Sequence, residues 1–209
     1  MKRSYLFVVI VALAFMVGGC SAPPAESPSP STENWLARKS SSPSIAPSPA
    51  GSVSPPTGTL GTSRTNPVSM GTPLTTPNGV ETTVIRLIKG AEAWNILLNA
   101  NEFNDPPAAG MQYVIVTVRV KNISAEDDPV LVSDVDFSLT GSSNKVFGTY
   151  DRSAVLPSEG DLAVLERKLF RGGEQVGSMH FYTPENESNL VLIWKKVFPE
   201  SESRYFEVH

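Results

Sequence analysis

The sequence predicts an all-β domain, a β-sandwich of about seven to nine short strands with one short helix. Three observations predict it. Apolar and polar residues alternate over several runs in the second half of the chain, as in half-buried strands. Turn-forming pairs such as Asn78-Gly79 and Gly172-Gly173 separate these runs. Only one stretch has helical character, so we expect almost all regular structure to be strand.

The clearest predicted strand lies between Tyr113 and Val120 and carries its four valines on one face. A second run, residues 131–139, alternates in the same way and places Val135 and Phe137 together. Further strands are predicted at Val80–Ile88, Lys145–Tyr150, Leu162–Leu165, Val176–Thr183, Leu190–Val197 and Arg204–Val208.

The core of the sandwich should form where the apolar faces of these strands meet. No cysteine pair is available to link the two layers, so packing alone must hold them. We expect the core to contain Val84, Val116, Val118, Val135, Phe137, Phe181, Leu192 and Trp194.

The N-terminus, residues 1–19, has the pattern of a signal peptide. Lys2 and Arg3 precede an uncharged apolar run from Leu6 to Val17. As a helix this run would span about 18 Å, which is too short for a hydrocarbon core of about 30 Å. The run therefore fits the hydrophobic region of a signal peptide better than a membrane span.

The residues Val17-Gly18-Gly19-Cys20 resemble the lipobox of bacterial lipoproteins. That resemblance implies cleavage between Gly19 and Cys20 and attachment of acyl chains such as palmitate to Cys20, the only cysteine of the chain. An ordinary secretory signal with an incidental cysteine is the alternative. We expect a lipid anchor to the outer leaflet of the cytoplasmic membrane or to the outer membrane, with the protein exposed outside the cytoplasm.

Residues 20–63 are predicted to be the lipidated cysteine followed by a disordered linker. Of the 43 residues at 21–63, 25 are Pro, Ser or Thr. Such a composition cannot bury enough apolar surface to offset the entropy lost on ordering. We therefore place the folded domain at residues 64–209.

Several segments of this predicted domain resemble a known family. Arg64–Pro67 and Asn101–Pro107, with the later residues Gly172–Gly177, Phe181 and Pro184, are similar to bacterial exported domains with a telokin-like, immunoglobulin-like sandwich. The resemblance covers residues 64–209 and implies an immunoglobulin-like β-sandwich. The function of that family is unknown, so the resemblance implies no catalytic residues.

Charge and composition exclude several functions. The net charge is -4, and the part from Arg64 onward holds 13 basic and 19 acidic residues, which argues against binding of nucleic acid. His180 is the only internal histidine, and the alternation places it with Ser178 and Tyr182 on a face that we expect to be solvated. We predict no catalytic residue, no cofactor and no enzymatic activity.

Acidic residues form two groups that could be considered for calcium. Glu126-Asp127-Asp128 is one, and Asp134 with Asp136 is the other, which the alternation places on the outer face of a strand. Neither matches an EF-hand loop. We interpret both as solvated acidic surface and predict no metal site.

The helical stretch Ala91–Ala100 is more apolar than a surface helix needs to be. Something must cover the excess. Phe103 with Pro106-Pro107 could fold back over it, or the helix could plug an open end of the sandwich. Alternatively, an exposed apolar patch docks a partner. The candidate partner-binding residues are Trp94, Leu97, Leu98 and Phe103.

Together these patterns predict a lipid-anchored interaction module that binds another envelope protein or a cell-wall component. The alternative is a small-ligand carrier or sensor of the cell envelope. A pocket large enough for a ligand would favour the carrier, whereas a flat apolar patch would favour the interaction module.

Overall fold

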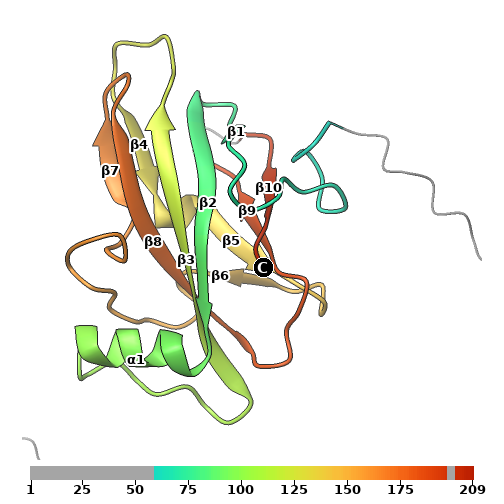
Figure 1. The fold of residues 1–209 in the computed structure, drawn as a ribbon, viewed down its shortest axis with the longest axis vertical. Coiled ribbons are helices and arrows are strands. Elements are labelled where there is room, and N and C mark those ends of the chain that lie inside the picture. The colour runs from blue at the N-terminus through green and yellow to red at the C-terminus, as the bar shows by residue number, and fades with distance from the viewer. Residues whose placement is uncertain (1–58, 197–200) are drawn as a thin grey trace, which may run out of the picture. The chain divides into compact units, whose positions relative to one another are not determined.

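The computed structural model describes residues 59–196 and 201–209. The predicted signal peptide, Cys20 and most of the predicted linker lie outside the described residues. The described part is a β-sandwich with ten strands in three antiparallel sheets and one α-helix (Figure 1). The predicted fold class, a β-sandwich with one short helix, is confirmed.

The larger sheet has the strand order β1-β2-β3-β8. Its members are β1 (Leu74–Thr75), β2 (Val80–Lys89), β3 (Met111–Asn122) and β8 (Glu174–Pro184). β3 is paired along its length with β2 on one side and β8 on the other. This central position explains why its valines form an uninterrupted apolar row: both edges of the strand are hydrogen-bonded and one face meets the second layer.

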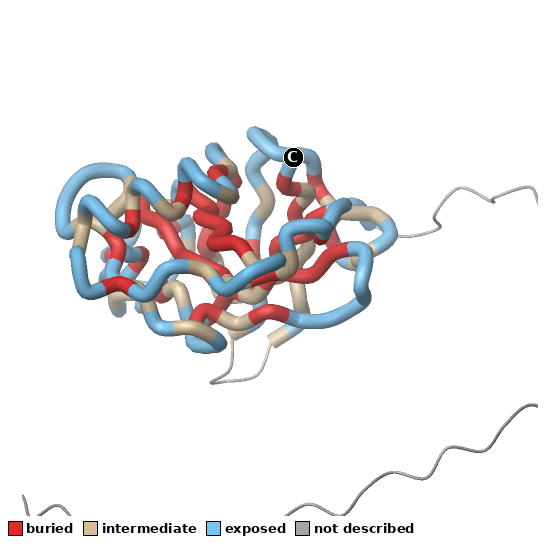
Figure 2. The backbone as a smooth tube through the Cα atoms, turned by 90° about the horizontal axis from the view of Figure 1, so that it is seen from below, coloured by how far each residue is buried: buried red, intermediate tan, exposed pale blue. Residues whose placement is uncertain are grey.

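The second layer is a four-stranded sheet with the order β10-β9-β5-β6. It consists of β5 (Phe137–Thr140), β6 (Val146–Gly148), β9 (Val191–Trp194) and β10 (Arg204–Glu207). Buried residues gather where the two layers face each other (Figure 2). Seven of the eight predicted core residues are buried there, namely Val84, Val116, Val118, Phe137, Phe181, Leu192 and Trp194.

The run predicted as one strand at residues 131–139 is divided between two sheets. β4 (Val130–Ser133) pairs with β7 (Glu166–Leu169), and a short 3-10 turn, η1 (Asp134–Asp136), leads into β5. The turn shifts the side-chain alternation. Val135 is therefore 39% exposed, and its predicted place in the core is wrong. Simple alternation cannot reveal a strand that changes sheets, because both halves keep a two-residue period.

A β-bulge in β2 likewise changes which side chains face inward. The register with β3 shifts between Val84 and Arg86. Val84 packs between the layers before the shift, whereas beyond it Leu87 packs inward and Ile88 packs on the outer face. Ile88 thereby joins a second apolar cluster, outside the sandwich core.

The N-terminal segment of the described part is paired with the last strand. The Tyr205 N–H donates to the Gly61 carbonyl at 2.9 Å, and the Val68 N–H donates to the Tyr205 carbonyl at 2.9 Å. Val68 is buried in the core. The described chain is therefore hydrogen-bonded to its last strand from Gly61 onward.

The helix α1 (Ala91–Ala100) has the predicted bounds and covers one end of the outer face of the larger sheet (Figure 1). Gly90 connects it to β2 with a φ of 65°, a left-handed conformation that favours glycine. Ala93 and Leu97 are fully buried against this face, which contributes Tyr113 and Ile115 to the same cluster.

Candidate ligand-binding site

The outer face of the larger sheet carries a group of stacked aromatic rings. The Trp94 ring from α1 lies 6.1 Å from the Tyr113 ring with an interplanar angle of 17°, and the Tyr182 ring lies 5.1 Å from Tyr113. The Tyr113 hydroxyl donates to the Asp105 carbonyl at 3.0 Å, and the Ala108 N–H donates to the Tyr182 hydroxyl at 2.8 Å. The two tyrosines thus pack through their rings and are hydrogen-bonded at their hydroxyls.

An irregular segment, residues 149–165, crosses the same face beside α1 and joins β6 to β7. We call it the cover segment. Arg152 from this segment places its guanidinium carbon 5.8 Å from the centre of the Tyr182 ring and forms an ion pair with Asp105 at 2.8 Å. Leu156 packs into the cluster under α1. The helix and the cover segment together form a third layer over part of the sheet.

Asn104 ties the cover segment to the end of α1. Its amide nitrogen donates to the carbonyls of Leu97 at 2.7 Å and Val155 at 2.9 Å. Its amide oxygen accepts the Val155 N–H at 2.8 Å. One buried side chain therefore satisfies three backbone groups from two separate segments.

The far end of the cover segment lies along the edge of β8. The Ser178 N–H donates to the Ala163 carbonyl at 2.7 Å, and the Leu165 N–H donates to the Ser178 carbonyl at 2.9 Å. This approach requires Gly177, because a Cβ there would lie 2.9 Å from the Leu165 Cα. The sequence predicts a strand at Leu162–Leu165. Val164 forms only an isolated bridge, and the strand β7 begins after it.

His180 lies beneath the cover segment and is 7% exposed, so the predicted solvated position is wrong. The alternation along β8 is correct, since His180 and Tyr182 do share the outer face. What the alternation could not indicate is that other chain covers this face. The ring Nε2 lies 2.9 Å from the Arg152 carbonyl. A carbonyl only accepts, so Nε2 carries the proton, and Nδ1 of the neutral ring is an acceptor.

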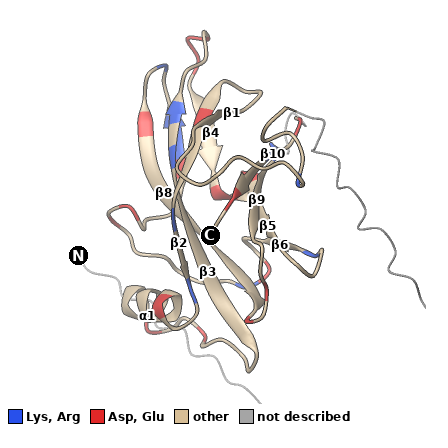
Figure 3. Ribbon diagram, turned by 45° about the vertical axis from the view of Figure 1, so that its right-hand side comes forward, with Lys and Arg blue, Asp and Glu red and all other residues tan. Residues whose placement is uncertain are grey.

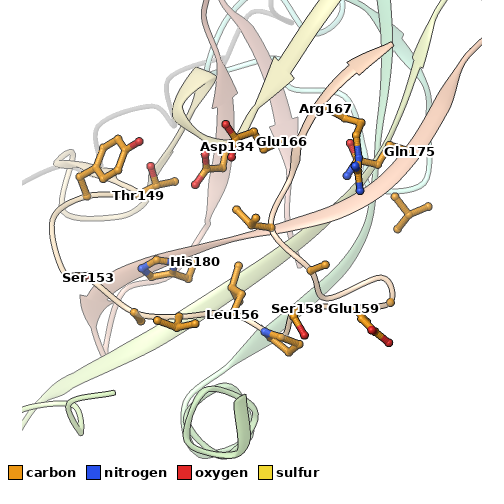
Figure 4. A pocket seen from close by; sticks show the side chains of 18 residues that line it. Asp134, Thr149, Ser153, Leu156, Ser158, Glu159, Glu166, Arg167, Gln175 and His180 are labelled. Atoms are coloured by element: carbon orange, nitrogen blue, oxygen red, sulfur yellow. The ribbon is translucent and has the colours of Figure 1, made fainter. Parts of the chain in front are cut away.

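A half-open pocket of about 830 Å³ lies between the cover segment, β7 and β8 (Figure 4). This volume is within the range of about 300–1,000 Å³ that is usual for small-molecule sites. Apolar walls come from Val155, Leu156 and Val164, and polar side chains come from Asp134, Glu166 and other residues of the rim. Tyr150 on the rim is 80% exposed.

Asp134 and Glu166 lie side by side at one end of the pocket, whereas Arg167 and Gln175 lie together at another (Figure 4). Partial burial raises the pKa of Asp134 above its usual range, although the Ser133 hydroxyl donates to its carboxylate at 3.2 Å. Attraction to the His180 ring lowers this pKa, and the Glu166 carboxylate raises it by repulsion to a smaller extent. Neither carboxylate has an ion-pair partner among the described residues.

The predicted partner-binding residues are divided by the structure. Leu97 is fully buried and Trp94 is half-buried against the sheet, so Leu97 cannot belong to an open docking surface in this conformation. Leu98 is 41% exposed and Phe103 is 83% exposed. Phe103 therefore does not fold back over the helix. The excess apolar surface of α1 is covered by its own sheet and by the cover segment instead.

Within the described residues, no three His, Cys, Asp or Glu residues are grouped so that they could hold a metal ion. Asp136 is buried and Asp134 borders the pocket, so these two do not form the predicted solvated strand face. Lys and Arg are interspersed with Asp and Glu along the strands and loops (Figure 3). No helix of the described part is long and apolar enough to cross a membrane.

The pocket cannot be predicted from the sequence by periodicity, because the cover segment has no periodic pattern. One signal was available. A connection longer than about 12–15 residues without regular structure is uncommon in a compact domain and is usually functional. Residues 149–165 form such a connection, but the strand predicted at Leu162–Leu165 made it look shorter.

The fold and the pocket define an all-β sandwich whose outer face is partly covered by a helix and an irregular segment. No family model matches the chain, and no curated protein matches it. Similar solved structures exist. The yjhA protein of Bacillus subtilis aligns with a TM-score of 0.48 and 12% identity, over 68% of this chain and 99% of that one.

Two further structures are similar to this chain. A proposed lipoprotein of Bacillus subtilis, ycdA, aligns with a TM-score of 0.45 and 13% identity over 64% of this chain and 37% of its own. An uncharacterized β-sandwich protein of Clostridium difficile 630 aligns with a TM-score of 0.35 and 12% identity over 75% of this chain and 100% of its own. At these values the similarities assign neither a family nor a function.

Proposed function

We propose that the chain is a lipid-anchored, non-enzymatic binding protein of the cell envelope and that its sandwich binds a small ligand in the pocket under the cover segment. The observation that carries the ligand-binding part is the pocket of about 830 Å³, with apolar walls and a few polar side chains. By the criterion set from the sequence, this pocket favours the carrier or sensor over the interaction module. The telokin-like, immunoglobulin-like relationship belongs to the same proposal.

The anchoring part is supported by the Val17–Cys20 motif at the end of a short apolar run. We expect Cys20→Ala to prevent both lipid attachment and cleavage at Gly19. Metabolic labelling with a fatty-acid analogue tests this directly, with the unchanged chain as the control. Label retained on the Ala variant would refute the anchor.

The pocket is tested by screening small fragments of mixed charge against the full-length chain with backbone amide chemical shifts. We expect some fragments to shift amides of the cover segment and of β8. Ser153 is exposed and lines the pocket, so Ser153→Trp should fill it and abolish those shifts. Ala125→Trp places the same bulk at an exposed site away from the pocket and should leave them unchanged. A screen in which no fragment shifts these amides would refute the proposed function.

A second candidate is docking of an envelope protein or cell-wall component on the exposed side chains of Leu98 and Phe103. The exposure of Phe103 favours it, since large exposed aromatic residues are enriched at binding surfaces. The double variant Leu98→Ser, Phe103→Ser should keep the melting temperature and lose a specific cross-linked partner in living cells. An unchanged cross-linking pattern would remove this candidate.

A further inference from the structure

The polar side chains of the pocket are rich in groups that only accept hydrogen bonds. Asp134 and Glu166 contribute two carboxylates at one end. The Gln175 amide oxygen is buried and has no hydrogen-bond partner. Arg167 is the one lining side chain, among the described residues, whose polar atoms are all obligatory donors. A ligand with donors of its own matches these accept-only groups.

His180 supports the same conclusion independently of the carboxylates. Its ring is 7% exposed and lines the pocket, while Nε2 donates to the Arg152 carbonyl. In the neutral form of the ring Nδ1 is an acceptor, and no hydrogen bond from a described residue reaches it. Nδ1 is not fully buried, so solvent or a ligand can donate to it. His180 thus marks the acidic end of the pocket as a place for a donor.

The charges at this end indicate which donor fits. Asp134 and Glu166 lie beside each other, and Asp134 is partly withdrawn from water, where an unpaired carboxylate is unfavourable. Neither is paired with Lys or Arg within the described residues. Arg167 follows Glu166 in β7, but its side chain lies toward Gln175 and not toward Asp134 (Figure 4). A cation from outside would neutralise this pair.

We propose that the pocket binds an organic ammonium with an apolar body, its ammonium group between Asp134 and Glu166 and its body against Val155, Leu156 and Val164. This inference rests on the proposed function and specifies its ligand. The ammonium group supplies up to three donors and a positive charge, which match the two carboxylates at this end of the pocket. The apolar side chains on the opposite wall supply the remaining contact surface.

Three probes of nearly equal size test the charge: 2-phenylethylamine, the neutral 2-phenylethanol and the anionic 3-phenylpropionate. Each is titrated into the full-length chain up to about 10 mM, and the amide shifts of the cover segment are followed. We expect the amine to bind most tightly. A peptide probe, acetyl-Ala-Lys-Ala-amide, carries the same ammonium group on a lysine side chain. Weaker binding of this peptide than of 2-phenylethylamine identifies a free small molecule as the ligand, and tighter binding would overturn that part of the inference.

Two adjacent residues provide a matched pair of variants. Glu166→Gln and Arg167→Gln remove opposite charges from exposed side chains of the same strand. Glu166→Gln should weaken binding of the amine about two- to fivefold, the range for a partly solvated ion pair, and leave the alcohol unaffected. Arg167→Gln should leave the affinity for the amine unchanged or raise it.

The outcomes separate this inference from the proposed function. Binding of the alcohol or the propionate at the cover segment, as tight as the amine or tighter, overturns the ammonium and keeps a ligand-binding pocket. If Glu166→Gln and Arg167→Gln weaken binding of the amine equally, the ammonium is likewise overturned and the ligand-binding pocket is kept. Absence of any shift at the cover segment with all probes and with the fragment screen overturns both.

Discussion

The two faces of β3 are buried equally well but by different kinds of structure. Val114, Val116 and Val118 on the inner face meet the strands of the second sheet. Tyr113 and Ile115 on the outer face are also fully buried, but under α1 and the cover segment. Strands present a regular apolar surface, whereas an irregular segment brings backbone and polar groups that need partners. The comparison teaches that the regular cover provides packing and the irregular cover leaves room for a site.

The largest expected effect is a cavity on the inner side. Leu192 is fully buried between the layers, so Leu192→Ala should lower the free energy of unfolding by about 3–5 kcal/mol. Urea unfolding measures this loss, and Val146→Ala, at a 63% exposed position, is the control with little expected change. A loss below about 1 kcal/mol would contradict tight packing between the layers.

On the outer side, Trp94→Ala should have a smaller effect on the free energy of unfolding. The ring is half-buried and stacked on Tyr113, so we expect a loss of about 2 kcal/mol, below the full value for a buried tryptophan. Leu98→Ala on the exposed side of the helix should change little. If Trp94→Ala destabilises as much as Leu192→Ala, the outer layer is as tightly packed as the core and the proposed difference is wrong.

Asn104→Ala should loosen the cover segment with a modest global cost. It leaves the Leu97 and Val155 carbonyls and the Val155 N–H without their partner, and we expect a loss of about 1–2 kcal/mol. Hydrogen exchange should accelerate at Val155 more than in β3. Asn101→Ala removes a single contact to the Phe103 N–H and is the matched control. Equal acceleration in both variants would show that Asn104 does not hold the segment.

The smallest effect has the opposite sign. The pKa of Asp134 is raised in the folded state, so its contribution is favourable at low pH and is lost as the pH rises through the folded-state value. Asp134→Asn should therefore raise the melting temperature slightly at pH 7, with a gain that disappears below the ordinary aspartate pKa of 3.8. Asp127→Asn, at an exposed position, should show no such gain. A lower melting temperature for Asp134→Asn at pH 7 would contradict this prediction.

The sequence was sufficient for the regular part of the molecule. Period-two alternation located β3 and β8, and the apolar excess at residues 91–100 located α1 with its bounds. The further runs predicted at Val80–Ile88, Leu190–Val197 and Arg204–Val208 contain β2, β9 and β10. Apart from β2, where a bulge shifts the register, these elements are recognisable because each keeps one pattern along its length. Their inner faces, including Phe181 and Leu192, could be assigned for the same reason.

The sequence was insufficient where the chain changes partners. At η1 the chain leaves one sheet for another and the alternation shifts, so Val132 is buried before the turn, Phe137 is buried after it, and Val135 between them is exposed. His180 is on the predicted face, yet the cover segment decides whether that face meets water. Contacts between residues far apart in sequence, such as Asn104 with Val155, leave no local pattern. The candidate site is built almost entirely from contacts of this kind.

The pairing of Gly61 and Val68 with β10 has a mechanical consequence. In a chain held by an anchor ahead of residue 59, any tension enters the domain through this segment. The first bonds to bear the load join the segment to Tyr205 and Glu207 of β10, in the sheet that carries neither α1 nor the edge of β8. Tension along the chain would therefore act on the last strand before it acted on the face that bears the pocket. The arrangement around His180 would be strained only after the bonds to β10 had given way.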